Sequence, residues 1–144
     1  SSHTMLENDY LHLSPDQGRQ GEAIEIEGRL IQTVRCGDNV VWFDFRDLCD
    51  GPRGAADYIE IARQFQTVLL ADIPVMSEQD NDMARRFITM VDEFYDRNVK
   101  LIITAADEPE GLYTGKRLQA MFERTISRLQ EMRSRDYLAK PHIP

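Results

Sequence analysis

The sequence predicts an α/β fold that combines a three-stranded β-meander with a Rossmann-like βαβ unit, whose parallel strands are flanked by amphipathic helices. Two observations favour this class. Residues 82–97, placed on a helix at about 100° per residue, put their apolar side chains on one continuous face. Apolar runs rich in β-branched residues lie on either side of that helix, at 67–73 and 99–104, which is typical of parallel strands covered on both faces. Strand, helix and strand in this order form a right-handed βαβ unit by strong default.

The N-terminal residues give little sign of regular structure. Residues 1–5, SSHTM, look like the remnant of a cloning site, and residues 6–21 combine Pro15, Gly18 and Gly21 with polar residues. We therefore expect residues 1–21 to be a cloning remnant followed by an extended, partly mobile entry segment or linker. Residues 22–144 are expected to form one α/β domain.

The predicted meander occupies residues 22–45. The strand at 22–27 places Ile24 and Ile26 on one side and acids on the other, and Gly28-Arg29 predicts a two-residue hairpin turn with glycine first. A strand at 30–36 follows, then a tight turn at 37–39 and a strand at 40–45 with apolar residues on both faces. The two turns are expected to set the register of the strands.

Helices and loops account for the remaining residues. A helical turn at 47–50, a loop at 51–54 and a helix at 55–65 are expected before the βαβ unit. The helix at 82–97 is expected to be capped by Asp80 or Asn81 and to end where Asn98 takes the left-handed conformation. Its apolar face covers nearly half of the circumference, so we expect it to contact a second element besides the sheet. The sequence then predicts a loop at 105–115, a helix at 116–132 and one helical turn before Pro141.

Composition and charge narrow the class of function. The chain has 144 residues and a formal net charge of −8, which argues against a nucleic-acid partner because binding to phosphates needs a basic excess. No apolar run reaches the roughly 20 residues that span a bilayer, so no transmembrane segment is expected. Cys36 and Cys49 lack the paired spacing of zinc sites. We therefore expect no metal site and a reduced, cytoplasmic protein.

Motifs for nucleotide binding or catalysis are missing from the sequence. No segment has the form GxxxxGK followed by Ser or Thr, and TGKR at 114–117 has the lysine without the first glycine and the hydroxyl. Asp107 and Glu108 follow a strand tip, where ligands bind in open α/β sheets, but no phosphate cradle accompanies them and we interpret them as exposed loop acids. No acid–base set converges around the histidines. The sequence predicts no catalytic residue and no cofactor bound by this chain alone.

Arginines are the candidate binding residues. Arg117, Arg124 and Arg128 fall in one row on the helix predicted at 116–132, and Arg135 continues the row if the helix extends. Guanidinium groups bind carboxylate or phosphate in bidentate fashion, so the row predicts an anion or nucleotide contact, in one version across a subunit boundary. Arg53, in the loop at 51–54, is a further candidate for the same contact.

Both arginine candidates have a structural alternative. The helix row can be a solvated face paired with Glu123 and Glu131, and Arg53 can be the carboxylate partner of Asp50 or Asp57. Exposed ion pairs of this kind are common on protein surfaces and contribute little to stability. The sequence alone leaves both interpretations open.

A family resemblance rests on four strings that agree in order: VVWFDFRDLCDGPRGAADYIEIARQFQTVLL, ARRFITMVDEFYDRNVKLIITAA, LYTG and FERTISRLQEMRSRDYL. They resemble the C-terminal part of the ZapE-type cell-division ATPases, which share a family with mitochondrial ATPases of the AAA+ class. The resemblance runs from about Ile24 to Leu138. This sequence departs from the family pattern at Gly54, at Gln66 and in the loop at 105–111.

The resemblance implies that this chain is the C-terminal domain of a longer ATP-hydrolysing AAA+ protein. Its Walker A and Walker B elements, with ATP and magnesium, would lie in an N-terminal half, so the isolated fragment is expected to be inactive. The expected partners are that N-terminal ATPase core, the division protein FtsZ and further copies in a homo-oligomer. The order strand, Thr104, loop, LYTG, Arg124 also resembles the second half of an AAA+ core. It implies that Thr104 senses the γ-phosphate and that Arg124 reaches a neighbouring subunit.

Two hypotheses about function follow. In the first, the domain supports nucleotide response, assembly or partner binding of a cell-division ATPase, through Arg53, Thr104, Arg124 and Arg128. In the second, it is an interaction module that recruits a protein partner and has no nucleotide role, because the exposed edge of the meander can accept an added strand.

Overall fold

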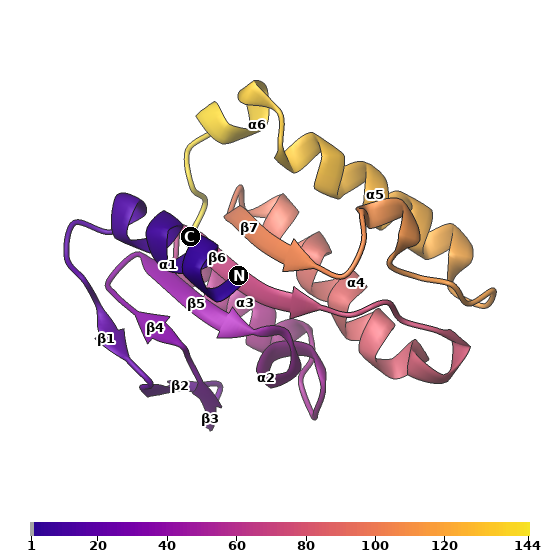
Figure 1. Cartoon of the computed structure of the whole chain (residues 1–144), viewed down its shortest axis with the longest axis horizontal. Helices are drawn as coiled ribbons and strands as arrows, with labels where there is room; N and C mark the ends of the chain where they lie inside the picture. Colours follow the sequence, from indigo (N-terminus) through magenta and orange to yellow (C-terminus); the bar gives the residue numbers. More distant parts are fainter. Residues whose placement is uncertain (1) are drawn as a thin grey trace.

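The structure, a computed structural model that describes residues 2–144, has a central sheet with helices on both faces (Figure 1). Helix α1 covers one face of the sheet, and α3 and α4 cover the other, with α5 packed against α4. In chain order the elements are α1 (Ser2–Leu13), β1 (Arg19–Gln20), β2 (Ala23–Ile26), β3 (Arg29–Gln32), β4 (Arg35–Cys36), β5 (Val40–Asp44), α2 (Phe45–Cys49), α3 (Ala55–Gln64), β6 (Thr67–Ile73), η1 (Glu78–Asp80), α4 (Asn81–Asp96), β7 (Lys100–Ala105), η2 (Pro109–Gly111), α5 (Gln119–Met132) and α6 (Arg135–Ala139).

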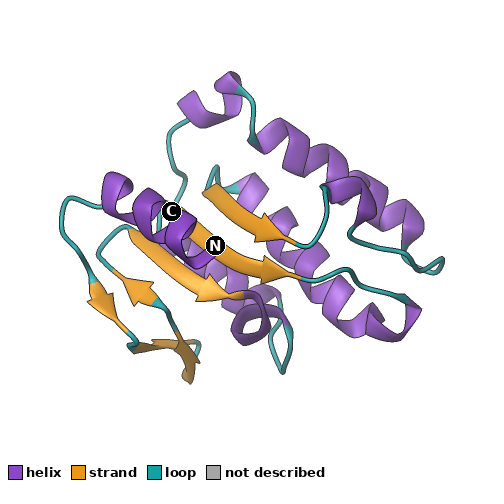
Figure 2. Ribbon diagram, in the orientation of Figure 1, coloured by secondary structure: helices purple, strands orange, loops and turns teal. Residues whose placement is uncertain are grey.

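The predicted α/β class with parallel strands is confirmed (Figure 2). Five strands pair in the order β1-β4-β5-β6-β7, and β5, β6 and β7 run parallel to one another. Strand β4 is antiparallel to both β1 and β5, so β1 has the same direction as β5. Because α3 and α4 connect the three parallel strands from the same face, this part of the chain is the expected βαβ arrangement.

The antiparallel strands of the predicted meander are divided between two sheets. Strands β2 and β3 form a separate two-stranded sheet, whereas β4 joins the main sheet. The chain changes sheet at Thr33 and Val34, whose backbone N–H groups donate to the carbonyl oxygens of Glu22 and Trp42. The Thr33 hydroxyl also donates to the Glu22 carbonyl oxygen at 2.6 Å, which fixes the bend.

The first hairpin turn lies one residue earlier than predicted. Ile26 pairs with Arg29, so the turn consists of Glu27 and Gly28, with φ values of 52° and 75°. Two positive φ values are those of a type I′ turn, whose twist matches the right-handed twist of paired strands. The prediction of Gly28-Arg29 is therefore wrong, and Arg29 begins β3 instead.

Helix α4 is confirmed to within one residue of its predicted ends. Asn98 has a φ of 54° and ends the helix in the left-handed conformation, as predicted. Asp80 stands at the N-cap without accepting a helix N–H; its carboxylate accepts from Ser77 instead. The predicted apolar face is buried almost completely, at Met83, Ala84, Phe87, Ile88, Met90, Val91 and Phe94.

The width of this face brings α4 against more than the sheet, as expected. The ring of Phe87 lies 5.9 Å from that of Phe45 in α2 and 6.1 Å from that of Phe122 in α5, measured between centroids. Helix α3 packs along α4 as well. The core between the sheet and these helices therefore includes residues from every major helix except α1.

Strand β7 is less covered than the sequence predicts. It lies at the end of the strand order, and its residues from Lys100 to Thr104 are only partly buried. Strand β6, with a similar apolar sequence, lies between β5 and β7 and is buried at every position except Asp72. The predicted cover on both faces is therefore only partial: Leu101 and Ile103 pack against one core and Ile102 against the other, but in the described part of the chain only one edge of β7 has a neighbouring strand.

The predicted extended segment at 6–21 is wrong for residues 6–13, which belong to α1. Leu6 and Tyr10, one helical turn apart, are fully buried and form a second core. This core lies on the opposite face of the sheet, against Val40, Trp42, Leu69 and Ala71. The assignment of residues 1–5 to a cloning remnant stays a prediction; Ser1 lies outside the described residues, and Ser2 to Met5 form the start of α1.

The other helices follow the predicted pattern with shifted ends. Helix α3 covers residues 55–64 of the expected 55–65, and α6 is the expected short helix before Pro141. Helix α2 begins at Phe45 rather than at Asp47, and α5 begins at Gln119 rather than at Lys116. None of the helices within residues 2–144 has the length and apolar character needed to cross a bilayer.

The two-faced sheet predicts that α1 contributes to folding stability through Leu6. Replacing Leu6 with alanine removes buried methyl groups from the second core and should lower the free energy of unfolding by about 2–4 kcal/mol. Leu11, on the same helix but 42 % exposed, is the matched control, and Leu11→Ala should cost less than about 1 kcal/mol. Urea unfolding of both variants measures the difference; equal effects would mean that α1 does not dock.

Candidate functional site

The carboxyl ends of the parallel strands carry Asp44, Asp72 and Thr104. Asp72 has a φ of 63°, rare for a residue other than glycine, and its backbone N–H donates to the Thr104 hydroxyl at 2.9 Å. The pairing of β6 with β7 shifts register between Leu70 and Ile73, so this bond stabilises an irregular strand end. Thr104 thus has a role within the sheet, and its implied contact with a γ-phosphate stays a prediction.

Electrostatics at this end of the sheet disfavour an anionic ligand. Asp44 and Asp72 line a hollow of about 280 Å³ together with Asp47, and Arg46, which also lines it, is paired with Asp50. Partial desolvation, followed by the negative charges of Asp47 and Asp72, raises the pKa of Asp44. A phosphate placed here would meet the same repulsion. Within residues 2–144 no group of three or more His, Cys, Asp or Glu side chains has the geometry to hold a metal ion.

The structure brings Arg124 and Arg128 together on one carboxylate. Asp92 of α4 pairs with Arg124 at 3.5 Å and forms a closer ion pair with Arg128. The Arg128 guanidinium also lies over the Tyr95 ring, 4.9 Å from its centroid, a cation–π arrangement that fixes it further. The Tyr95 hydroxyl donates to Glu131 at 2.7 Å. Arg128 therefore connects α5 to α4 through both Asp92 and Tyr95.

Exposure separates the two arginines. The Arg124 side chain is 59 % exposed, against 25 % for Arg128. With a single ion pair at 3.5 Å, Arg124 is held weakly and its guanidinium can turn toward another group. The predicted row does not continue to Arg135, because α5 ends at Met132 and Ser134 caps a new helix through the N–H of Tyr137.

The segment 112–117 positions the start of α5 and offers no free phosphate cradle. The Glu78 carboxylate accepts the backbone N–H groups of Lys116 and Arg117. The Lys116 N–H bond is the main reason that the pKa of Glu78 is lowered. The Tyr113 hydroxyl donates to Asn81 at 2.7 Å and accepts the N–H of Leu118. The amides that a phosphate would need at TGKR are thus already bonded to Glu78, a contact that sequence reasoning missed.

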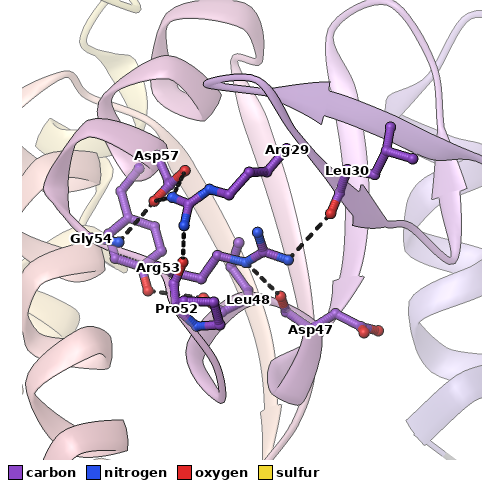
Figure 3. A network of polar contacts seen from close by, with 9 residues as sticks. Arg29, Leu30, Asp47, Leu48, Pro52, Arg53, Gly54 and Asp57 are labelled. Atoms are coloured by element: carbon purple, nitrogen blue, oxygen red, sulfur yellow. Dashed lines mark hydrogen bonds and ion pairs between the residues drawn. The ribbon is translucent and has the colours of Figure 1, made fainter.

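Arg53 lies in a polar network that joins the β2–β3 hairpin to α2 and α3 (Figure 3). Its guanidinium donates to the backbone carbonyl oxygens of Asp47 and Leu30, at 3.3 and 3.4 Å. It pairs with neither carboxylate that the sequence offered: Asp50 pairs with Arg46, and Asp57 pairs with Arg29. The proposed carboxylate partners of Arg53 are therefore wrong, although its donors are used within the domain.

Arg29 is the residue of this network that sequence reasoning missed. Its guanidinium donates to both carboxylate oxygens of Asp57, at 2.8 and 2.6 Å, and to the carbonyl oxygen of Pro52. Asp57 is only 1 % exposed and also accepts the backbone N–H of Gly54 at the start of α3. Figure 3 shows Arg29 reaching the 51–54 loop from the hairpin, while Arg53 extends from that loop toward Leu30 of the hairpin. The sequence signal that could have indicated this contact is Asp57, an acid in the first helical turn after Gly54.

An apolar groove along β7 is the remaining surface feature. It has a volume of about 650 Å³ and lies between the strand and α5. Leu101, Ile103 and Leu129 line its apolar part, and Asp107 and Arg133 contribute charges. None of the four predicted site residues lines it. The four are held in three separate contact groups, around Asp72, Asp92 and the 51–54 loop.

The sequence of this chain is similar to those of known proteins. The family model for AFG1-like ATPases matches residues 1–141. The chain is 40% identical to the cell division protein ZapE of Escherichia coli K12 over 134 residues, which is 93% of this chain and 36% of that protein. It is 36% identical to an uncharacterized protein of Schizosaccharomyces pombe, over 75% of this chain and 24% of that one. It is also 32% identical to lactation elevated protein 1 homolog B of Danio rerio, over 79% of this chain and 29% of that one.

The chain thus spans about a third or less of the length of these relatives. No solved structure matches it.

The polar network predicts that Arg29 stabilises the fold more than an exposed arginine does. Arg29→Ala leaves the buried Asp57 carboxylate without its charged partner and should lower the free energy of unfolding by about 2–3 kcal/mol. Arg46→Ala is the control, because its pair with Asp50 is exposed on both sides and should be worth less than about 1 kcal/mol. Chemical unfolding measures both variants; a loss of under about 0.5 kcal/mol for Arg29→Ala would exclude this role.

Proposed function

The chain belongs to the AFG1-like ATPase family, and from this premise we propose that it is the C-terminal part of an ATP-hydrolysing AAA+ protein that acts in cell division. The proposal includes action on the FtsZ ring in the cytoplasm. It is supported by the similarity to ZapE, of which this chain spans 36% of the length. ATP and magnesium would be bound by an N-terminal ATPase core outside these residues, since the 144 residues contain no GxxxxGK[ST] loop.

Within that protein, we assign this domain a supporting role in nucleotide response and assembly, through Arg124. One observation carries the assignment: the Arg124 guanidinium is exposed on the outer side of α5 while the neighbouring Arg128 is fixed by Asp92 and Tyr95. The weakly held arginine can reach an anion on another subunit, and the fixed one keeps α5 in place. Arg53 and Thr104, whose polar atoms are bonded within the domain, are assigned to the scaffold.

A second candidate function is partner recruitment without any nucleotide role. The outer edge of β7, which no strand within residues 2–144 pairs with, and the apolar groove beside it favour this alternative. The other edge of the main sheet, β1, has only two residues and offers a poor template for strand addition.

The isolated 144-residue chain should neither bind nor hydrolyse ATP. The backbone N–H groups of Lys116 and Arg117, in the TGKR segment, are bonded to Glu78, and the strand ends carry aspartates. Calorimetric titration with ATP and magnesium, together with a phosphate-release assay, should give no signal above buffer. Saturable, magnesium-dependent binding at micromolar concentration would contradict the assignment of the nucleotide site to the absent part.

In the full-length protein, Arg124→Ala should lower ATP turnover by at least about tenfold, because arginines that stabilise a transferred phosphoryl group contribute factors of roughly 10³–10⁵. Arg63→Ala is the matched control, since Arg63 has a similar exposure of 56 % and a local pair with Glu60. Steady-state turnover and sedimentation of the oligomer are the measurements. Unchanged turnover and assembly with Arg124→Ala would remove this arginine from the mechanism and favour partner recruitment.

A further inference from the structure

The backbone of β7 alternates between a paired and an unpaired side. The N–H of Lys100 donates to the carbonyl oxygen of Gln66 and the N–H of Ala106 to that of Ile73, so the even-numbered residues point toward β6. Because successive residues of a strand point their N–H and C=O groups to opposite sides, Leu101, Ile103 and Ala105 point theirs outward. No strand in the described part of the chain pairs with that side.

The groove beside β7 has the shape that an added strand would need. It is lined by the consecutive residues Leu101, Ile102 and Ile103, whose side chains alternate between the two faces. The groove therefore follows the edge of the strand rather than one face of the sheet. Leu129 and Met132 of α5 form its far wall, and Figures 1 and 2 show α5 running alongside β7 on the side away from β6.

The direction of α1 indicates where the preceding polypeptide lies. The Ser2 hydroxyl donates to Asp72 at the carboxyl end of β6, and the Tyr10 hydroxyl donates to the carbonyl oxygen of Val40 at the amino end of β5. Helix α1 thus runs antiparallel to the parallel strands, as the helix of a βαβ unit does. The first described turn of α1 therefore lies at the carboxyl edge of the sheet, next to the end of β7.

Handedness then selects the side of the sheet on which a strand before α1 would lie. Strands β5, β6 and β7 follow one another across the sheet with their helices on one face, whereas α1 lies on the opposite face. A crossover through α1 is right-handed only if it moves across the sheet in the reverse direction, from the β7 side toward β5 and β1. A strand before α1 would therefore start from beyond β7.

We propose that a segment directly preceding α1 in the longer protein forms a parallel strand on the outer edge of β7 and fills the groove beside α5. This rests on the proposed function only in requiring that the chain be part of a longer protein, as its 36% share of ZapE suggests. To match β7, the segment needs about six residues at roughly 3.3 Å each, joined to α1 by a loop of about 2–6 residues.

The chemistry of the groove defines this segment. Its residues are apolar on both faces, because Leu129 and Met132 lie on one side and Ile102, with the α1 core, on the other. Asp107 and Glu108 follow the carboxyl end of β7 and outnumber Arg133 in the groove, so they disfavour acids at that end of the added strand. A second copy of this chain is the competing occupant, and the experiment below distinguishes the two.

Amide hydrogen exchange at single-residue resolution tests the proposal without any substitution. In the 144-residue chain, the amides of Leu101, Ile103 and Ala105 should exchange with little protection, whereas those of Ile102 and Thr104 in the same strand should be protected by β6. In the full-length protein the first three should slow by at least about 100-fold. The inward-facing amides are the internal control.

Two results would overturn the proposal. One is that the outward amides stay unprotected in the full-length protein. The other is that they become protected in the 144-residue chain as its concentration rises, with a dimer in sedimentation, which would make a second copy the occupant. The readout does not involve ATP, so loss of turnover and failure of strand pairing are distinguishable.

Adjacent alanines provide a matched pair of variants for the full-length protein. Ala105→Pro removes an outward donor and should raise the exchange rate of Leu101 and Ile103 by at least about tenfold, with α4 amides unchanged. Ala106→Pro removes the inward N–H bonded to Ile73 and should leave the protection of those two amides intact. Equal effects of the two prolines would contradict pairing at the outer edge.

Discussion

Burial of the wide apolar face of α4 is the constraint on which the domain depends. A helix that is apolar over almost half of its circumference cannot be covered by a sheet alone. The ring of Phe87 illustrates how this face is covered, because it contacts Phe45 of α2 and also Phe122 of α5. Each large side chain buried in this way contributes about 1.5–3 kcal/mol as an upper bound. The position of α5, and with it that of the arginines, follows from this packing.

Three carboxylates then tie peripheral segments to the packed centre. Asp57 holds the β2–β3 hairpin through Arg29, Asp92 holds α5 through Arg128, and Glu78 holds the chain just before α5 through two backbone N–H groups. In each case the partners are far apart in sequence. Asp57 is almost fully buried and needs its partner most, whereas Asp92 and Glu78 are better solvated and contribute less. Arg29 and Arg128 thus stabilise the domain itself.

The sequence predicted those parts of the fold that repeat over many residues of one segment. The amphipathic period of α4 and the apolar runs of β6 and β7 are local patterns, so their elements could be predicted to within a residue or two. Helix α1 could not, because only Leu6 and Tyr10 mark its buried side. The contacts of Arg29 and Glu78 depend on residues 28 and 38 positions away, which no local pattern reveals. The relation to a longer ATPase came from the family resemblance, because no local pattern in these residues indicates it.

Strand β7 shows how a mismatch between pattern and burial carries information. Its sequence is that of a strand covered on both faces, like β6, yet it lies at an edge and is only partly buried. Natural edge strands are commonly protected by charge, proline or shortness, because their free N–H and C=O groups are a template for aggregation. Beyond Lys100, β7 has only apolar residues and one threonine, and none of these protections. A strand with this composition suits the interior of a sheet.

The position of α1 on the opposite face agrees with an interior position for β7. In doubly wound sheets, helices on the two faces connect parallel strands in opposite directions across the sheet. The residue pattern of β7 and the handedness of α1 are independent observations, and both point to one further strand.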